Sequence, residues 1–171
     1  SIFEFSQKVG NPDKLNTNLT LGSSDLALLL DGPLGNNSSF VLSARKSYLQ
    51  FLFKALQLPF LPEYNDIQFK YLNRLSDQSE LTVIGLGAID NFSLNKEAND
   101  GLSDIETLNR NQYILDNIPV NDQWNYTIGS RYRYFMPKGG FHTLVLSRNH
   151  LNNTAIKFDD NIENIENLVL D

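Results

Sequence analysis

The feature that most constrains the fold of this sequence is an alternation of apolar and polar residues in runs longer than an ordinary strand. In the clearest run the apolar members are Trp124, Tyr126, Ile128, Tyr132 and Tyr134, and the residues between them are Asn125, Thr127, Gly129, Arg131 and Arg133. A second run, over residues 15–21, alternates leucine and threonine with asparagine and threonine. Successive side chains of a strand point to opposite faces, so a period of two is typical of a strand with one apolar and one polar face.

The same pattern predicts further strands, at about residues 25–32, 40–50, 66–75, 81–92 and 141–149. About seven strands result, and several approach the roughly 9–11 residues of a tilted membrane-spanning strand rather than the roughly 5–6 of a soluble sheet. Tight turn sequences at residues 32–37, 76–79 and 137–140 join neighbouring strands, while residues 51–65, 96–123 and everything after His150 form long links. The sequence therefore predicts an all-β antiparallel meander.

Leucine and phenylalanine recur with helical spacing at Leu49, Leu52, Phe53 and Leu56, which predicts a short helical segment ending before Pro59. Aromatic residues gather in two groups along the meander. The group expected at the tight turns is Phe40, Tyr132, Tyr134, Phe135 and Phe141, and the group expected at the long links is Tyr48, Phe51, Phe53, Phe60, Tyr64, Phe92 and Trp124. Between these two girdles we expect an apolar band of Leu26, Leu28, Leu30, Leu42, Ala44, Ile84, Leu86 and Ile128.

Composition excludes several functions. The net charge is −6, which argues against nucleic acid because phosphate contacts need clustered Lys and Arg. The chain has no Cys, and no run of about 18 apolar residues could form a spanning helix. His142 and His150 share strand parity but lie too far apart for one metal ion. The acidic residues Asp159, Asp160, Glu163 and Glu166 are expected on an exposed loop. The sequence predicts no enzyme, no cofactor and no metal site.

Four stretches resemble the TonB-dependent receptors of Gram-negative outer membranes, which are plugged barrels that import nutrients. Residues 1–11 resemble the last strand of the plug domain, and residues 30–48 resemble the second barrel strand, its periplasmic turn and the third strand. Residues 61–70 and 81–90 are similar to the fourth and fifth strands. The resemblance implies that residues 12–171 are the N-terminal part of a 22-stranded barrel.

The resemblance also implies a place in the cell, partners and a truncated assembly. The chain would be a fragment of an outer-membrane receptor that takes up a siderophore, cobalamin or oligosaccharide, with the TonB energy-transducing complex and outer-membrane lipid as partners of the full-length protein. We expect the fragment to self-associate through its unpaired strand edges. The alternative, a soluble all-β carbohydrate-binding module, would cover the apolar strand faces with a second packed sheet.

The barrel interpretation makes a prediction about which side chains share a face. Charged side chains avoid lipid, so we expect one polar, lumen-facing set: Arg45, Gln68, Lys70, Arg74, Asn125, Arg131 and Arg133. Lys46 is the exception, because it has the parity of Leu42 and Ala44. It is expected near a membrane interface, where its long side chain can reach water.

Overall fold

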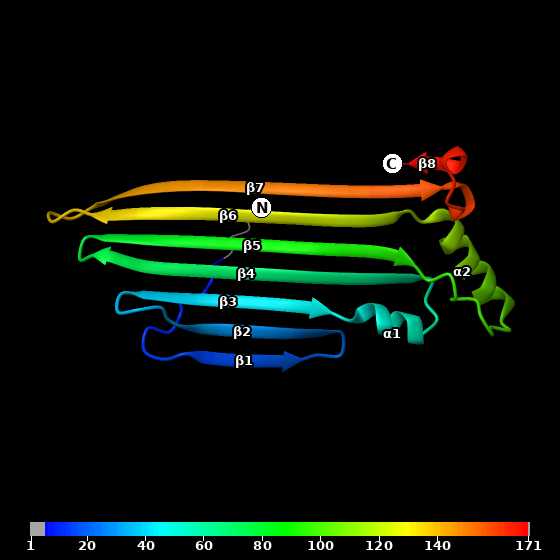
Figure 1. Cartoon of the computed structure of the whole chain (residues 1–171), viewed down its shortest axis with the longest axis horizontal. Coiled ribbons are helices and arrows are strands. Elements are labelled where there is room, and N and C mark those ends of the chain that lie inside the picture. Colours follow the sequence, from blue (N-terminus) through cyan, green and yellow to red (C-terminus); the bar gives the residue numbers. More distant parts are fainter. Residues whose placement is uncertain (1–5, 171) are drawn as a thin grey trace.

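The computed structural model describes residues 6–170, which form a single antiparallel meander (Figure 1). The strands are β1 (Asn16–Leu21), β2 (Asp25–Pro33), β3 (Ser38–Ser47), β4 (Phe60–Ser76), β5 (Ser79–Leu94), β6 (Val120–Phe135), β7 (Phe141–Phe158) and β8 (Leu168–Leu170). The helices are α1 (Leu49–Ala55) and α2 (Ile105–Asn117), with short 3-10 turns η1 (Asp159–Asn161) and η2 (Ile165–Asn167). Each strand pairs with the next in the order β1 to β8, which confirms the predicted fold class.

The strands are longer than the alternation predicted. The links expected over residues 51–65 and after His150 are wrong, because β4 begins at Phe60 and β7 continues to Phe158. Pairing with a long neighbour extends each strand: Phe60 is opposite Leu94, and Ile156 is opposite Val120. The structure also adds β8, so the meander has eight strands rather than about seven.

The two ends of the sheet differ in how the strands are joined. Tight turns join β2 to β3, β4 to β5 and β6 to β7 at one end, as predicted, and we call this the turn end (Figure 1). The opposite end, the loop end, carries α1, α2 and the 3-10 turns. The expected helical segment after the third strand is confirmed by α1. The link between β1 and β2, over residues 22–24, is also short although it lies at the loop end.

The register defines the two faces of the sheet. Arg45 is opposite Asp66, Asp66 is opposite Ala88 and Ala88 is opposite Asn125, and paired residues of antiparallel strands share a face. We call this the polar face. The opposite side of the sheet is the apolar face. Its side chains alternate along each strand with those of the polar face, and one of its rows is Ala44, Ile67, Gly87 and Tyr126.

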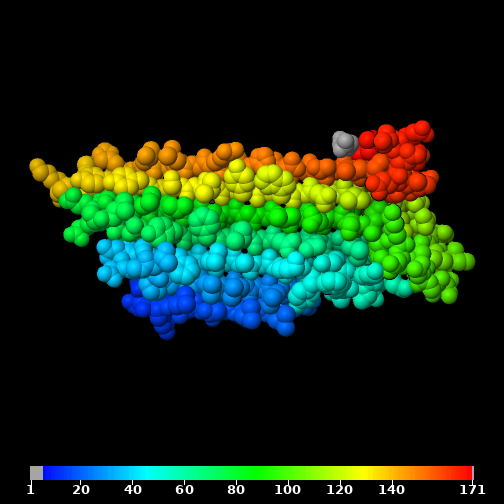
Figure 2. All heavy atoms as spheres, viewed as in Figure 1, coloured from blue at the N-terminus to red at the C-terminus, as the bar shows by residue number. Residues whose placement is uncertain are grey.

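No second layer covers the sheet within residues 6–170. The sheet lies in a single layer, with the strands side by side in sequence order (Figure 2). The accessible surface is 11948 Å², whereas a compact protein of 19.4 kDa exposes about 8,500 Å². Ala98, in the link before α2, is the one buried apolar side chain among the described residues. The sheet thus has no hydrophobic core of its own.

The loop end contains the densest packing of the described residues. Asn111 of α2 is buried and donates to the carbonyl of Ala98, and Asn95 donates to the carbonyl of Leu58. Asn161 of η1 donates to the carbonyls of Leu115 and Ile118, at the end of α2. These asparagine side chains replace apolar contacts as the means of holding the links together. Neither helix has the length and apolar character needed to cross a membrane.

The N-terminal segment, over residues 6–15, is neither helix nor strand and lies on the polar face. Lys8 Nζ lies 2.8 Å from Asp31 Oδ1, and the Asn11 backbone N–H donates to Asp31 Oδ2 at 3.1 Å. Gly10 lies directly on the backbone of Phe40, where a β-carbon would collide with the peptide. In the stretch resembling a plug strand, residues 1–5 lie outside the described residues, and no strand forms over the remainder.

Candidate functional site

The polar face holds every residue of the predicted lumen-facing set. The strand register places these residues on the same side of the sheet as Arg45 and Asn125: Gln68, Lys70, Arg74, Arg131 and Arg133. Arg131 and Tyr132 accordingly lie on opposite faces. The alternation in the sequence was therefore sufficient to assign these residues to one surface.

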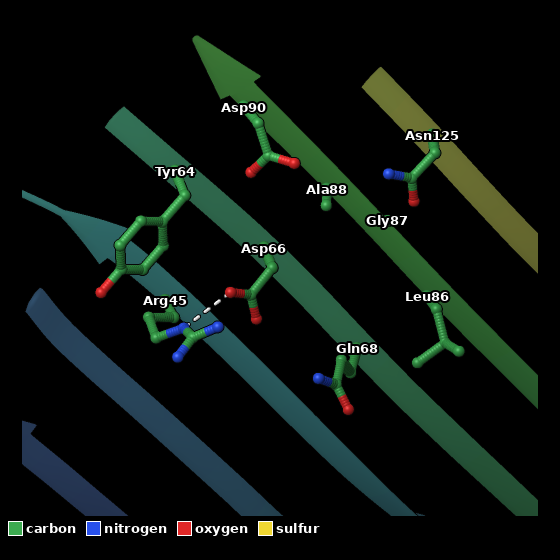
Figure 3. Close-up of a pocket in the computed structure, with 9 residues that line it drawn as sticks. All are labelled: Arg45, Tyr64, Asp66, Gln68, Leu86, Gly87, Ala88, Asp90 and Asn125. Atoms are coloured by element: carbon green, nitrogen blue, oxygen red, sulfur yellow. Dashed lines mark hydrogen bonds and ion pairs between the residues drawn. The ribbon is translucent and has the colours of Figure 1, made fainter. Parts of the chain in front are cut away.

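A hollow of about 640 Å³ lies over the loop half of the polar face (Figure 3). Arg45 of β3 donates through Nε to Asp66 Oδ2 of β4 at 2.7 Å, and its guanidinium lies 3.8 Å from Asp25. The same guanidinium lies 5.0 Å from the ring centroid of Tyr64. Gln68, Asp90 and Asn125 surround this ion pair from three strands. The hollow is open, and its charged and amide side chains offer hydrogen-bond donors and acceptors in one place.

Two arginines form ion pairs with one carboxylate on the turn half of the polar face, and two further cations lie on the same face. Glu80 of β5 lies between Arg74 of β4 and Arg133 of β6 in a single row. Glu80 Oε1 is 3.4 Å from Arg133 and 3.7 Å from Arg131, so one oxygen serves both guanidinium groups. Lys70 lies two rows away and donates to the backbone carbonyl of Gln7 at 2.8 Å. We call these four cations with Glu80 the turn-end basic cluster.

The Nε atoms of Arg131 and Arg133 are buried and have no hydrogen-bond partner among the described residues. A buried donor without an acceptor costs free energy. Each guanidinium instead pairs with Glu80 through a terminal nitrogen, Nη2 in Arg131 and Nη1 in Arg133.

The apolar face carries most of the predicted band. Its five rows between the two ends contain Leu19, Leu28, Leu30, Leu42, Ala44, Ile67, Phe69, Val83, Ile89, Ile128, Leu144 and Leu146. Ile84 and Leu86 were assigned to this band and lie instead on the polar face, opposite Lys70 and Gln68. Nearly every residue of β5 is apolar or glycine between residues 81 and 89, so its sequence alone does not show which parity faces which side.

Two glycines of β5 take the places on the apolar face that Ile84 and Leu86 leave. The Phe69 ring lies over Gly85, where any β-carbon would overlap it. Gly87 leaves an open hollow beside Ile67, Ile89 and Trp124. Gly85 thus makes room for the Phe69 side chain of the neighbouring strand, whereas the space beside Gly87 stays open.

The aromatic girdles are confirmed only in part. Phe40, Tyr132 and Tyr134 lie on the apolar face near the turn end. The first girdle is wrong for Phe135 and Phe141, which pair with each other on the polar face beside Arg133. The second girdle is wrong for three members: Phe60, Tyr64 and Phe92 lie on the polar face, where Phe60 stacks on Phe92 with ring centroids 5.7 Å apart. On the apolar face the loop end of the band is marked by Trp124 and Tyr126.

The apolar face changes to polar at the row of Trp124, which already contains Lys46, Asn65 and Asn152. The next row toward the loop end consists of Glu63, Asn91, Asp122 and Thr154. Lys46 lies beside this boundary and reaches Glu63 Oε1 at 3.5 Å with its side chain 72% exposed. This agrees with the expectation that Lys46 lies near the edge of the band.

One functional candidate escaped the sequence interpretation. Arg148 of β7 lies on the apolar face opposite Ile128, in the middle of the band. Arg148 is separated from His142 and His150 by even numbers of residues, so the sequence already indicated that the three side chains share a face of the strand. Its guanidinium carbon lies 6.0 Å from the ring centroid of Tyr126, one row closer to the loop end.

The histidines and acidic residues form no metal site in the described part of the chain. His142 and His150 share the apolar face but lie near opposite ends of it. Comparisons with protein families, with curated proteins and with solved structures found no match. The resemblance to TonB-dependent receptors therefore rests on the quoted stretches of sequence.

Proposed function

We propose that the chain forms part of the wall of a transmembrane barrel, with the apolar face against lipid and the polar face toward the lumen. The observation that carries this proposal is the height of the apolar band. Tyr134 and Trp124 mark its two ends and are ten residues apart on β6. Ten residues span about 33 Å along a strand, or about 23 Å at a tilt of about 45°. Outer-membrane barrels carry an apolar band of about 25 Å.

Three further observations support the proposal. The polar row of Glu63, Asn91 and Asp122 ends the band where headgroups and water would begin. The sheet has two open edges in the described residues, so it needs further strands to close. Residues 6–11, which resemble the end of a plug, lie on the face that would line the lumen.

The family resemblance adds the finer proposal of nutrient import across a Gram-negative outer membrane. In that role the hollow around Arg45 and the loop end would contribute hydrogen bonds to a siderophore, cobalamin or oligosaccharide. The turn-end basic cluster would contact acidic groups of a plug. Tight capture of a nutrient requires polar groups that converge from several sides, so this wall alone is expected to bind such ligands weakly and to catalyse nothing.

One observation favours the alternative of a carbohydrate-binding module. Trp124 stacks on Tyr126, and Tyr126 stacks on His150; stacked rings are suited to the apolar side of a sugar. A soluble module also needs a packed core, and the described residues supply one buried apolar side chain. We therefore prefer the barrel wall.

Refolding with and without a membrane mimic tests the proposal. With detergent micelles or phosphatidylcholine vesicles we expect β-sheet circular dichroism and slow hydrogen exchange in β4, β5 and β6. Without them we expect association through the apolar face and the strand edges. A monodisperse, slowly exchanging monomer in plain buffer would contradict the barrel wall. Calorimetric titration with siderophores, cobalamin and oligosaccharides should detect weak binding at most, and a sub-micromolar dissociation constant would favour the soluble module.

A further inference from the structure

The loop-side part of the apolar face holds a group of side chains unlike the rest of the band. His150 of β7 lies 4.6 Å from Trp124 and 5.7 Å from Tyr126, measured between ring centroids. Asn152, in the same row as Trp124, follows on β7. Arg148 extends over Tyr126 toward this group. We call Trp124, Tyr126, Arg148 and His150 the β6–β7 patch.

Arg148 is the cation of this patch and has no acidic partner within residues 6–170. The other cation on the apolar face of the strands, Lys46, reaches Glu63 at 3.5 Å. Arg148 instead has Ile128 directly opposite and Leu146 on the same face of its own strand. A guanidinium near the middle of an apolar band is costly, by about 2–4 kcal/mol at the midplane of a bilayer. Its lean toward the loop end reduces that cost by bringing the charge closer to the headgroup level.

An apolar hollow adjoins the patch. It has a volume of about 350 Å³, and its lining includes Ile67, Gly87, Ile89 and Trp124. The missing side chain of Gly87 creates the depression, since the atoms nearest to a β-carbon there would be 3.5 Å away or more. Trp124 borders both the hollow and the patch, so the two are continuous.

The cation of the patch fits an anionic lipid headgroup. An arginine binds phosphate oxygens through paired charge-assisted hydrogen bonds, and His150 supplies a second nitrogen donor. The hollow at Gly87 adjoins the patch in the rows of Tyr126 and Trp124, and its apolar lining accepts aliphatic groups at the edge of the band. Charge complementarity selects an anionic lipid over a zwitterionic one.

We propose that the β6–β7 patch binds the phosphate group of an anionic membrane lipid. This inference rests on the proposed function, because it needs the apolar face to lie against lipid. It goes further by assigning a lipid class and a place on the wall.

Trp124 makes the site directly measurable, since it is the only tryptophan of the chain. The protein is folded into phosphatidylcholine vesicles that contain a minor fraction of lipid with brominated acyl chains, which quench tryptophan at contact. The brominated lipid is either phosphatidylglycerol or phosphatidylcholine. We expect phosphatidylglycerol to compete for the site about five- to tenfold better.

Two variants separate the specific site from general charge attraction. Arg148→Gln should reduce the preference for phosphatidylglycerol to about one, while quenching by both lipids persists. Lys46→Gln removes the same charge from the same face and should leave the preference unchanged. A preference retained in Arg148→Gln, or lost equally in Lys46→Gln, would overturn the proposal.

The other outcomes are also decisive. Equal quenching by the two lipids in the unaltered chain overturns the lipid site and leaves the barrel wall standing. Absence of quenching by either lipid contradicts the barrel wall itself. Loss of the preference on adding inorganic phosphate would mean that the patch recognises a free anion. A change in Trp124 emission on adding a soluble glycoside in plain buffer would favour the sugar-binding alternative. Either result, with inorganic phosphate or with the glycoside, would overturn the proposal.

Discussion

Leu29 and Leu30 are consecutive residues of β2 that lie on opposite faces of the sheet. Leu30 lies in a row with Leu42 and Phe69, so its surroundings are those of the apolar band. Leu29 pairs with Ser43, which is opposite Gln68, so it lies among polar groups. The two leucines are alike in sequence, and only the register distinguishes them. In a single-layer sheet, the surroundings of a side chain are therefore set by the face on which it lies rather than by its own residue type.

The largest expected effect comes from placing a charge on each face at these two positions. Leu30→Arg puts a guanidinium into the apolar band and should destabilise vesicle-folded protein by about 2–4 kcal/mol. Leu29→Arg, the matched control, adds the same charge to the polar face and should cost less than about 1 kcal/mol. Urea titration in vesicles measures both. Equal losses of unfolding free energy in the two variants would mean that both faces of the sheet meet the same solvent.

The next effect concerns how the apolar face is packed. Gly85→Ala places a β-carbon inside the ring of Phe69, which must move, and we expect a loss of about 1–3 kcal/mol. Gly87→Ala is the control, because its β-carbon would meet Ile67 at an ordinary 3.5 Å, and it should stay within about 0.5 kcal/mol. Both are measured by the same urea titration. A neutral Gly85→Ala would show that Phe69 does not lie over β5.

A smaller effect is expected from the ion pair of Arg45 and Asp66 on the polar face. The Arg45 side chain is 45% exposed, so water screens the pair. A double-mutant cycle with Arg45→Gln and Asp66→Asn should give a coupling of about 0.2–1 kcal/mol that decreases with added salt. A coupling above about 2 kcal/mol that resists salt would indicate a site without water. The polar face would then not be the open, hydrated surface that distinguishes it from the apolar face.

The smallest effect lies outside both faces, at the start of α2. The Thr107 side chain and backbone N–H both donate to the Asp104 carboxylate and lower the pKa of that group. Because the pKa is lowered in the folded chain, the cap's contribution is complete above the ordinary value of about 3.9 and is lost as pH falls through the lowered value.

The amide shift of Thr107, followed by NMR, measures this cap. It should titrate with a midpoint below the ordinary value, and Asp104→Asn should abolish the titration while the asparagine still caps the helix. A midpoint at or above the ordinary value would contradict the assigned cap.

Much of the fold could be predicted from the sequence because alternation is a local signal. The strict period of two in β6 was enough to separate Arg131 from Tyr132. Turn-forming residues, which are Gly, Pro and Asn in two turns and Ser and Asp in the turn at residues 76–79, located three hairpins. In each case the relevant information lies within a few neighbouring residues.

The misassigned parts depend on partners distant in sequence. The loop half of β7 contains Asn152 and Asn153 without alternation, and it extends because β6 pairs with it. Pro62 is accommodated in β4 where β3 no longer pairs, since that pairing ends at Asn65. The α2 helix had a local signal in Asp104 with Thr107 that the interpretation missed.

The β6–β7 patch could not be found from local pattern alone. Trp124 and Tyr126 were recognisable as strand aromatics, and His150 as a histidine of known parity. Their meeting depends on the register that sets Tyr126 opposite His150. Arg148 was overlooked because its strand was predicted to end at Asn149, where a charge near the end needs no explanation.

The proposal that the sheet lies between lipid and water is tested most directly by measuring which residues of β6 meet lipid and which meet water. The chain has no native cysteine, so single cysteines at residues 125–132 can each carry a nitroxide label in vesicle-folded protein. Collisions with oxygen, which concentrates in the bilayer, should peak at residues 126, 128, 130 and 132. Collisions with a water-soluble nickel chelate should peak at residues 125, 127, 129 and 131. Equal accessibility of both sets to both reagents would contradict the account of one sheet between lipid and water.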